Sequence, residues 1–338
     1  MVRGLRIAVI GCGRIGAMHA ANIAKHPRAR LAAVNDIDRA VAEAVGRSTG
    51  AQVIDSAEAV FSSPEVDAVL IASATDTHSD LLEQAVKAGK PVLCEKPIDL
   101  SLSRVNRCAE AIRGAKMPIQ VGFVRRFDPG HKAVRDAVRA GAVGDLHQVI
   151  VTSRDPGLAP EAYLKRSGGI LRDMTIHDFD MARYVLGEEP TVVFATGSRL
   201  VAPALMQALG DYDTIAVTMT TASGQQAIVL NSREAVYGYD QRVEAFGTKG
   251  MAVSENRRPH QMALSGKDFT DQAAPLLNFF IERYREAFDA EIDAFVESAT
   301  TGKPAVVGFE DGRLALVLAE AAVRSISEGR PVKVSEIG

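Results

Sequence analysis

The stretch LRIAVIGCGRIGAMHAANIAKH, residues 5–26, decides the fold of the first part of the chain. It begins with a short apolar run, Leu5–Ile10, and continues as a helical pattern after Gly11, Gly13 and Gly16. In a GxGxxG at such a junction, the first glycine allows a tight turn, the second lets the backbone approach a pyrophosphate, and the third lets helix and strand pack closely. The helix N-terminus then offers N–H groups and a positive dipole end to the phosphates. The stretch therefore predicts a dinucleotide-binding unit.

A second apolar strand, RLAAVNDID, places Asp36 at its end. A carboxylate there can accept hydrogen bonds from both ribose hydroxyls of an adenosine, as in dinucleotide-binding folds. It would repel a 2′-phosphate, so it favours NAD over NADP, although Arg39 nearby is a residue type that accommodates such a phosphate. The alternative is that Asp36 is a turn residue that caps the next helix.

Short strands alternate with helical patterns up to residue 124. We expect strands over 51–55, 66–74, 91–96 and 118–124, and helices over 56–65, 78–90 and 101–115. This alternation predicts a parallel sheet with right-handed crossovers, in which ligands lie at the carboxyl ends of the strands. Polar or unusual residues gather at those ends: Thr75, Asp76, Thr77, His78, Glu95, Lys96 and Pro97. Among these residues, Lys96 is the main candidate for a site residue. The alternative is that Lys96 is a surface lysine that pairs with Glu95.

The chain from residue 124 on has a different pattern. Stretches rich in β-branched residues and partly alternating in hydrophobicity lie over 147–155, 191–201, 213–222, 226–235 and 241–255. They lack long helices between them, which favours antiparallel pairing. Helical patterns follow over 279–302 and 309–329. We therefore divide the sequence into a dinucleotide-binding domain, 1–123, and a second α/β domain, 124–338. A broad sheet with one uncovered face would favour burial against a partner.

The stretch GGILRDMTIHDFDMARYVLG, residues 168–187, reads as an amphipathic helix that carries several charges. Asp173 and His177 are four residues apart, hence on one face, and Asp180 is three residues beyond His177. Histidine has a reference pKa of about 6.5, which suits a general base, and a neighbouring carboxylate can fix its tautomer. The alternative is an ordinary solvated face. Since no further metal-ligand spacing stands out, we expect no metal.

Composition excludes several classes of protein. A chain of 338 residues with 47% hydrophobic residues is long enough for two domains. A net charge of −3 and the lack of a basic block give no support for nucleic-acid binding. No apolar run approaches the roughly 18 residues of a membrane span. The three cysteines have no metal spacing, and their odd number fits a reducing compartment, so we expect a cytoplasmic protein.

Three motifs together identify a family resemblance. GCGRIGAMHAANI (11–23), ATDTHSDL (74–81) and CEKPIDLSL (94–102) resemble the oxidoreductases of the glucose–fructose oxidoreductase, inositol dehydrogenase and rhizopine-catabolism superfamily. GFVRRFDPGHKAVRDAV (122–138) and YGYDQRVEAFGTKGM (237–251) are similar to its inositol 2-dehydrogenase branch. The resemblance implies a Rossmann domain followed by an α+β domain with a large, open, mostly antiparallel sheet. It also implies a homotetramer in which that sheet forms interfaces.

The resemblance assigns roles to individual residues. The DxxxH motif of the superfamily matches Asp173 and His177, and its EKP lysine matches Lys96; these three are the expected catalytic residues. The expected substrate contacts add Arg126, Asp155 and one of Tyr237 and Tyr239, and an ion pair with Asp128 is the alternative for Arg126. The residues expected to bind NAD are Gly11, Gly13, Arg14, Ile15, Gly16, Asp36, Ala74, Thr75, His78, Glu95 and Lys96.

The expected reaction is NAD-dependent oxidation of a cyclic polyol, with myo-inositol oxidised at C2 to 2-keto-myo-inositol (scyllo-inosose) as the first hypothesis. His177 would remove the hydroxyl proton, supported by Asp173, while the Lys96 ammonium stabilises alkoxide character on the same oxygen. Scyllo-inositol, D-chiro-inositol or an aldose oxidised at C1 would use the same groups. Two alternatives remain open: an NAD-dependent glycosidase that oxidises its substrate transiently, and a sugar sensor without activity.

Overall fold

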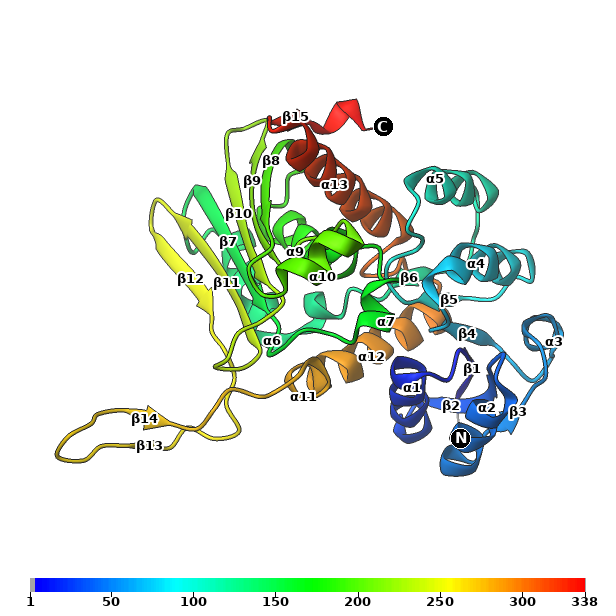
Figure 1. The fold of residues 1–338 in the computed structure, drawn as a ribbon. Helices are drawn as coiled ribbons and strands as arrows, with labels where there is room; N and C mark the ends of the chain where they lie inside the picture. The colour runs from blue at the N-terminus through cyan, green and yellow to red at the C-terminus, as the bar shows by residue number, and fades with distance from the viewer. Residues whose placement is uncertain (1–3, 338) are drawn as a thin grey trace. The chain divides into compact units, whose positions relative to one another are not determined.

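The computed structural model describes residues 4–337, which divide into two compact units (Figure 1). The first unit extends to Val124 and also includes Phe288–Leu314. The second comprises Arg125–Ala287 and the chain from Ala315 on. The division expected from sequence, 1–123 and 124–338, therefore differs from the structure at two places: Val124 belongs to the first unit, and residues 288–314 return to it.

The first unit is built on a parallel six-stranded sheet with strand order β3-β2-β1-β4-β5-β6. This confirms the predicted Rossmann arrangement, in which the order reverses beside β1. The strands are β1 (Leu5–Ile10), β2 (Ala29–Asn35), β3 (Gln52–Val53), β4 (Ala68–Ile71), β5 (Val92–Cys94) and β6 (Ile119–Val121).

Helices cover both faces of this sheet, which explains why its strands are apolar almost throughout. Along β1, Ile7 and Val9 belong to the hydrophobic cluster on one face, and Ala8 and Ile10 to the cluster on the other. The helices are α1 (Arg14–Lys25), α2 (Arg39–Thr49), α3 (Ala57–Ser62), α4 (His78–Lys87) and α5 (Leu102–Ala111), with a short 3₁₀ helix, η1 (Thr75–Thr77).

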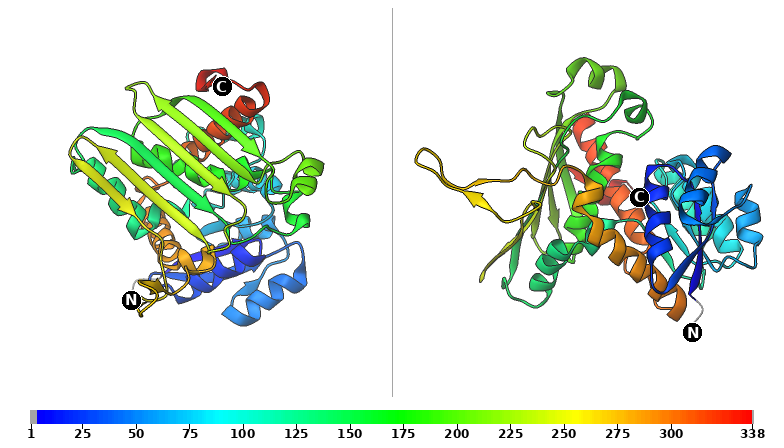
Figure 2. Two further views of the ribbon diagram at one scale, coloured as in Figure 1. Left: turned by 60° about the vertical axis from the view of Figure 1, so that its left-hand side comes forward. Right: turned by 90° about the horizontal axis from the view of Figure 1, so that it is seen from below.

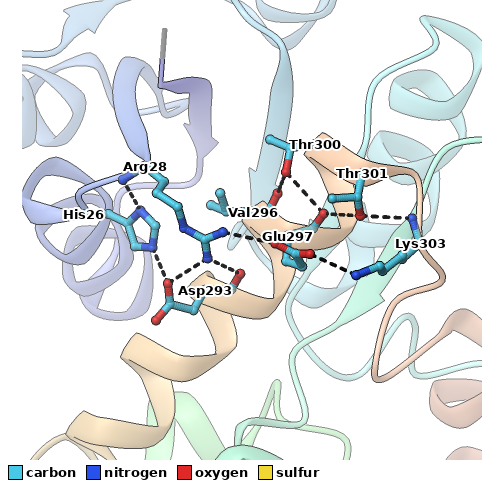
Figure 3. A network of polar contacts seen from close by, with 8 residues as sticks. All are labelled: His26, Arg28, Asp293, Val296, Glu297, Thr300, Thr301 and Lys303. Atoms are coloured by element: carbon cyan, nitrogen blue, oxygen red, sulfur yellow. Dashed lines mark hydrogen bonds and ion pairs between the residues drawn. The ribbon is translucent and has the colours of Figure 1, made fainter. Parts of the chain in front are cut away.

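Helix α12 (Arg285–Thr301) fixes the returning segment to the first unit. Its Ile292, Phe295 and Val296 join the same hydrophobic cluster as Ile7 and Val9. At the surface, Asp293 contacts His26 at 2.9 Å and Arg28 at 3.2 Å, and Glu297 lies 3.1 Å from Arg28 (Figure 3). The helix predicted over 279–302 is not continuous, because it breaks at Tyr284 between α11 (Phe280–Arg283) and α12.

The second unit contains a seven-stranded sheet with strand order β12-β11-β7-β10-β9-β8-β15. β7 and β10 are parallel and the other neighbours are antiparallel, which confirms the predicted mostly antiparallel sheet. The strands are β7 (Leu146–Arg154), β8 (Pro190–Ser198), β9 (Thr214–Thr221), β10 (Gln226–Ser232), β11 (Asp240–Gly247), β12 (Gly250–Ser254) and β15 (Val332–Lys333).

One face of this sheet is covered by helices, with α9 (Thr175–Leu186) against β7 and β10. The remaining helices of this unit are α6 (Pro129–Arg139), α7 (Glu161–Leu164), α8 (Ile170–Asp173), α10 (Pro203–Leu209) and α11, together with most of α13 (Phe309–Glu328). The other face shows its strands directly to the viewer in Figure 2, left, and a hairpin of β13 (Ala263–Leu264) and β14 (Gln272–Ala273) projects from that side.

The sequence contains no membrane-spanning run and no metal spacing among its cysteines, and the structure bears on both points. Within residues 4–337, no helix is long and apolar enough to cross a membrane. Cys12, Cys94 and Cys108 are free and buried.

Candidate active-site residues in the two units

The glycine turn after β1 leaves room for a ligand at one position. A Cβ on Gly11 would lie 2.4 Å from the Ser73 backbone nitrogen, and one on Gly16 would lie 1.8 Å from the Gly11 carbonyl oxygen. Both positions therefore need glycine for the fold itself. A Cβ on Gly13 would meet nothing within 4 Å in the described chain. The fold does not explain that glycine, whereas a pyrophosphate lying over the start of α1 would.

Asp36 lies against the same turn. Its Oδ2 accepts a hydrogen bond from the Cys12 backbone nitrogen at 2.6 Å, and its Oδ1 accepts one from the Asp38 nitrogen at 2.8 Å. Asp38, not Asp36, caps α2, since its side chain accepts from the Ala40 nitrogen. The alternative role for Asp36 as the helix cap is therefore wrong. Arg39 forms ion pairs with the carboxylates of Glu43 and Asp55.

The loops after β4 and β5 are joined by His78. One ring nitrogen of this buried histidine lies 2.9 Å from the Pro97 carbonyl oxygen, and the other lies 3.1 Å from the Ser73 carbonyl oxygen. Ala74 and Thr75 lie between Ser73 and His78, and the Lys96–Pro97 peptide bond is cis. The structure thus brings together the two loops in which five of the eleven predicted cofactor contacts lie.

Glu95 precedes Lys96 and points back into the first unit. Its Oε1 lies 2.7 Å from His19 Nε2, and its Oε2 accepts from the Lys96 backbone nitrogen at 3.3 Å. Burial opposes the charge of this carboxylate, but the hydrogen bond and charge of His19, with the charges of Lys96 and His78, hold its pKa below the usual range. His19 is therefore a side-chain partner of Glu95, and the charge of Lys96 also acts on this carboxylate.

In the second unit, Asp173 and His177 do not lie on one continuous helix. Helix α8 ends at Asp173, and α9 begins at Thr175 with His177 in its first turn. Almost every residue of α9 is buried, so the expected amphipathic helix over 168–187 is wrong in both continuity and exposure. Both carboxylate oxygens of Asp173 accept hydrogen bonds: Oδ1 from the Tyr163 hydroxyl at 2.6 Å, and Oδ2 from Arg233 at 3.3 Å.

Asp155 joins this group at the ends of two parallel strands. Arg154 at the end of β7 is in register with Ser232 at the end of β10, so the next residues, Asp155 and Arg233, are also neighbours. Burial and the negative charge of Asp173 raise the pKa of Asp155 to about 6. The predicted Asp155 and Asp173 are therefore close to each other, with Arg233 beside them.

The two arginines after Val124 are both buried and both paired with α9. Arg126 donates to the two oxygens of Asp180, at 2.8 and 2.6 Å, and Arg125 donates to Asp178 at 2.5 Å. Asp128 accepts a hydrogen bond from Arg283, and the pairing of Arg126 with Asp180 was not expected from the sequence. The sequence suggested that Asp180 could act as a carboxylate beside His177. In the structure, both carboxylate oxygens of Asp180 accept hydrogen bonds from Arg126.

Tyr237 and Tyr239 have different surroundings. The Tyr237 hydroxyl donates to Asp240 at 2.6 Å and accepts from Arg154 at 2.7 Å, and its half-exposed ring lines a hollow of about 690 Å³. Tyr239 is buried, which raises the pKa of its hydroxyl, and the charges of Arg125 and Asp155 reach that hydroxyl. Tyr239 is thus the one of the two that lies near Asp155.

Sequence reasoning missed the residues that hold the candidates in place. They are His19, Arg125, Tyr163 and Arg233. Arg233 could have been found from the sequence, because it directly follows a strand, as Asp155 does. The others had none in a single sequence. Among residues 4–337, the one group of three potential metal ligands that gathers is His19, Glu95 and Glu291, in the first unit.

Comparison with known families agrees with this geometry. Residues 5–123 match the family model described as "Oxidoreductase family, NAD-binding Rossmann fold", and residues 131–253 match the one described as "GFO/IDH/MocA C-terminal domain". The chain therefore belongs to the Gfo/Idh/MocA family of NAD-binding oxidoreductases. This confirms the family resemblance, the class of enzyme and the cofactor.

Individual relatives narrow the comparison. The chain is 46% identical to an inositol 2-dehydrogenase of Rhizobium meliloti over 98% of its length and 99% of that protein. It is 42% identical to a myo-inositol 2-dehydrogenase of Thermotoga maritima, over 98% and 99%. It also resembles the crystal structure of a scyllo-inositol dehydrogenase from Lactobacillus casei with bound NAD(H) and scyllo-inositol, with 30% identity, a TM-score of 0.91, and coverage of 98% and 100%.

Proposed function

We propose that this protein is an NAD-dependent inositol 2-dehydrogenase that oxidises myo-inositol at C2 to 2-keto-myo-inositol. The observation that carries the proposal is the similarity, over nearly the whole chain, to proteins named inositol 2-dehydrogenase. The carboxylates that gather at the ends of β7 and β10 support it, because a polyol presents many hydroxyl groups to be held by hydrogen bonds.

The first unit fits the cofactor. The open space at Gly13 and the N-terminus of α1, where Arg14 and Ile15 begin the helix, would receive the pyrophosphate. Asp36 would hold the adenosine ribose, and its negative charge would disfavour NADP. Bound NAD would supply the hydride acceptor for the oxidation. Ala74, Thr75, His78, Glu95 and Lys96 remain predicted contacts to it.

Three side chains have proposed catalytic roles. His177 removes the proton of the reacting hydroxyl. Asp173, itself held by Tyr163 and Arg233, fixes the imidazole and stabilises its protonated form. Lys96 stabilises negative charge on the reacting oxygen. A carboxylate held by two donors keeps one orientation, which suits a group that must fix another side chain.

The burial and the hydrogen-bond partners of the other candidate residues indicate which of them can contact the substrate. We propose Asp155 and Tyr239 as contacts to the other hydroxyls of the polyol, because both lie on the side of Asp173. Arg126 and Tyr237 are weaker candidates, since Asp180 occupies the guanidinium of Arg126 and Asp240 and Arg154 occupy the hydroxyl of Tyr237.

The stereoisomer is the open part of the proposal, because the Lactobacillus casei structure holds scyllo-inositol. The test is the formation of NADH by purified protein with NAD and a panel of myo-inositol, scyllo-inositol, D-chiro-inositol and glucose. We expect the highest kcat/KM with myo-inositol. A higher value with another member would change the substrate and keep the class. No NADH with any of them, with NAD binding verified separately, would favour the glycosidase or the sugar sensor.

We further propose that the protein is a cytoplasmic homotetramer. The uncovered face of the second sheet carries Phe194, Phe246 and Met251, residues that are 38, 44 and 61% exposed. Large apolar side chains on a broad uncovered sheet favour burial against another copy of the chain. The three free cysteines fit a reducing compartment.

A further inference from the structure

A buried group of three titratable side chains lies beneath the predicted cofactor loops of the first unit. It consists of His19 from α1, Glu95 after β5 and Glu291 from α12, whose potential ligand atoms all lie within 4.8 Å of one another. His19 and Glu291 are fully buried, and the Glu95 side chain is 13% exposed. The proposed mechanism assigns no role to His19 or Glu291.

Glu291 is the unexplained member of this group. Neither of its carboxylate oxygens has a hydrogen-bond partner among the described residues. A fully buried carboxylate without a donor is strongly disfavoured as an anion, and such a group takes up a proton or binds a cation instead. The charge that acts on it is the like charge of Glu95, and burial together with that charge raises the pKa of Glu291 well above the usual value.

Glu95, by contrast, is held from several elements at once. His19 Nε2 lies 2.7 Å from its Oε1, and the Lys96 backbone nitrogen donates to its Oε2. A Cβ built on Gly122, just after β6, would lie 2.9 Å from Oε2, so the carboxylate is packed against that backbone. The Glu95 side chain therefore links α1, the turn that carries Lys96, and the end of β6.

We propose that Glu291 is protonated at neutral pH and shares its proton with Glu95, so that the two carboxyl groups and His19 form a buried network that positions Lys96. Two hydrogen bonds of about 2.8 Å meeting at one water span roughly 4.6 Å, so a single water can complete the link. The titratable groups that face Glu95 are His19, Lys96, His78 and Cys94, and Glu95 itself faces Glu291. Glu291 is a positioning residue, and the part of the inference that concerns Lys96 rests on the proposed function.

The test compares Glu291→Gln, which mimics the protonated acid, with Glu291→Ala, which removes the donor. Glu297→Gln on the same helix is the control, because Glu297 is exposed and pairs with Arg28 and Lys303 at the surface. The readouts are the thermal melting temperature and the NAD dissociation constant between about pH 6 and pH 9, and kcat and KM for the best polyol.

The expected pH dependence has a definite sign. A carboxyl with a raised pKa in the folded state binds a proton that the unfolded chain has released, so its contribution to stability falls as pH rises towards that pKa. Glutamine does not titrate. The melting temperature of Glu291→Gln relative to the wild type should therefore rise with pH, while that of Glu297→Gln should not.

Activity supplies the second half of the test. We expect Glu291→Ala to lower kcat about tenfold or more with a smaller change in KM, and Glu291→Gln to recover most of that loss, because displacement of a catalytic group by about 1 Å is costly. Two results would overturn the inference: a Gln variant as impaired as the Ala variant, or one equivalent of tightly bound metal in the dialysed wild type. The melting measurement needs no turnover, so failure of the polyol panel would leave it decisive.

Discussion

At the residue scale, the three glycines of the first turn have different reasons to be glycine. Gly11 and Gly16 lie so close to neighbouring backbone that a Cβ has no room, whereas Gly13 faces open space. The structure itself thus separates glycines that serve the fold from the one that would serve the ligand.

This difference gives a matched pair of variants. We expect Gly13→Ala to fold with a melting temperature within a few degrees of the wild type and to bind NAD at least tenfold more weakly, because the methyl group would occupy the place of the pyrophosphate. Gly16→Ala should yield little folded protein, since the Cβ would overlap the Gly11 carbonyl. Thermal melting and NAD titration check both. Unchanged NAD affinity in Gly13→Ala would refute the phosphate assignment.

Single residues also show where sequence reasoning reaches its limit. Asp36 was placed correctly beside the glycine turn, because the motif fixes both the strand and its end. The pairing of Arg126 with Asp180 was missed, because an ion pair between residues distant in sequence depends on the packing of α9 and not on local spacing. Tyr163 and Arg233 were missed as the partners of Asp173 for the same reason.

At the element scale, the parallel pair of β7 and β10 within an otherwise antiparallel sheet explains why charged side chains gather there. Two parallel strands end at the same edge, so the residues that follow them, Asp155 and Arg233, lie side by side. The sequence predicted the sheet from its β-branched residues but not this pairing, because strand order is not visible in periodicity. Nor did periodicity reveal that α8 and α9 are separate helices.

The carboxyl of Asp155 should be detectable through the pH dependence of stability. Burial and Asp173 raise its pKa to about 6, above the unfolded value of about 3.9, so its stabilising contribution is lost as pH rises through this window. We expect the free energy of unfolding of Asp155→Asn, relative to the wild type, to increase between about pH 4 and pH 6 and to level off above. Denaturant titrations across that range check it; a flat difference would mean that Asp155 has an ordinary pKa.

At the scale of the whole molecule, the chain crosses between its units more than once. The strand–helix alternation identified the first unit up to residue 124, but nothing in the sequence of α12 assigned it to that unit. Its Phe295 and Val296 are apolar residues that would suit any core, and only their packing beside Ile7 and Val9 reveals which core they complete. Membership of a distant segment in a domain is therefore a property of tertiary structure.

The uncovered sheet face gives a prediction about assembly. We expect light scattering after size-exclusion chromatography to give a tetramer for the wild type, and a smaller species for Phe246→Asp, because a charge on that face would have to be buried in the interface. The charge change Glu297→Gln, in the first unit, should leave the mass unchanged. A monomeric wild type would contradict the proposed assembly.

The measurement that tests the central claim most directly is the rate of NADH formation from myo-inositol by the wild type and by His177→Ala, with NAD binding of both proteins measured in parallel. The account predicts a clear rate for the wild type and a loss of kcat of about a hundredfold or more in the variant, with NAD affinity preserved, because a positioned general base contributes on that scale. Equal rates in the two proteins would contradict the assignment of His177, and no NADH from the wild type would contradict the proposed reaction.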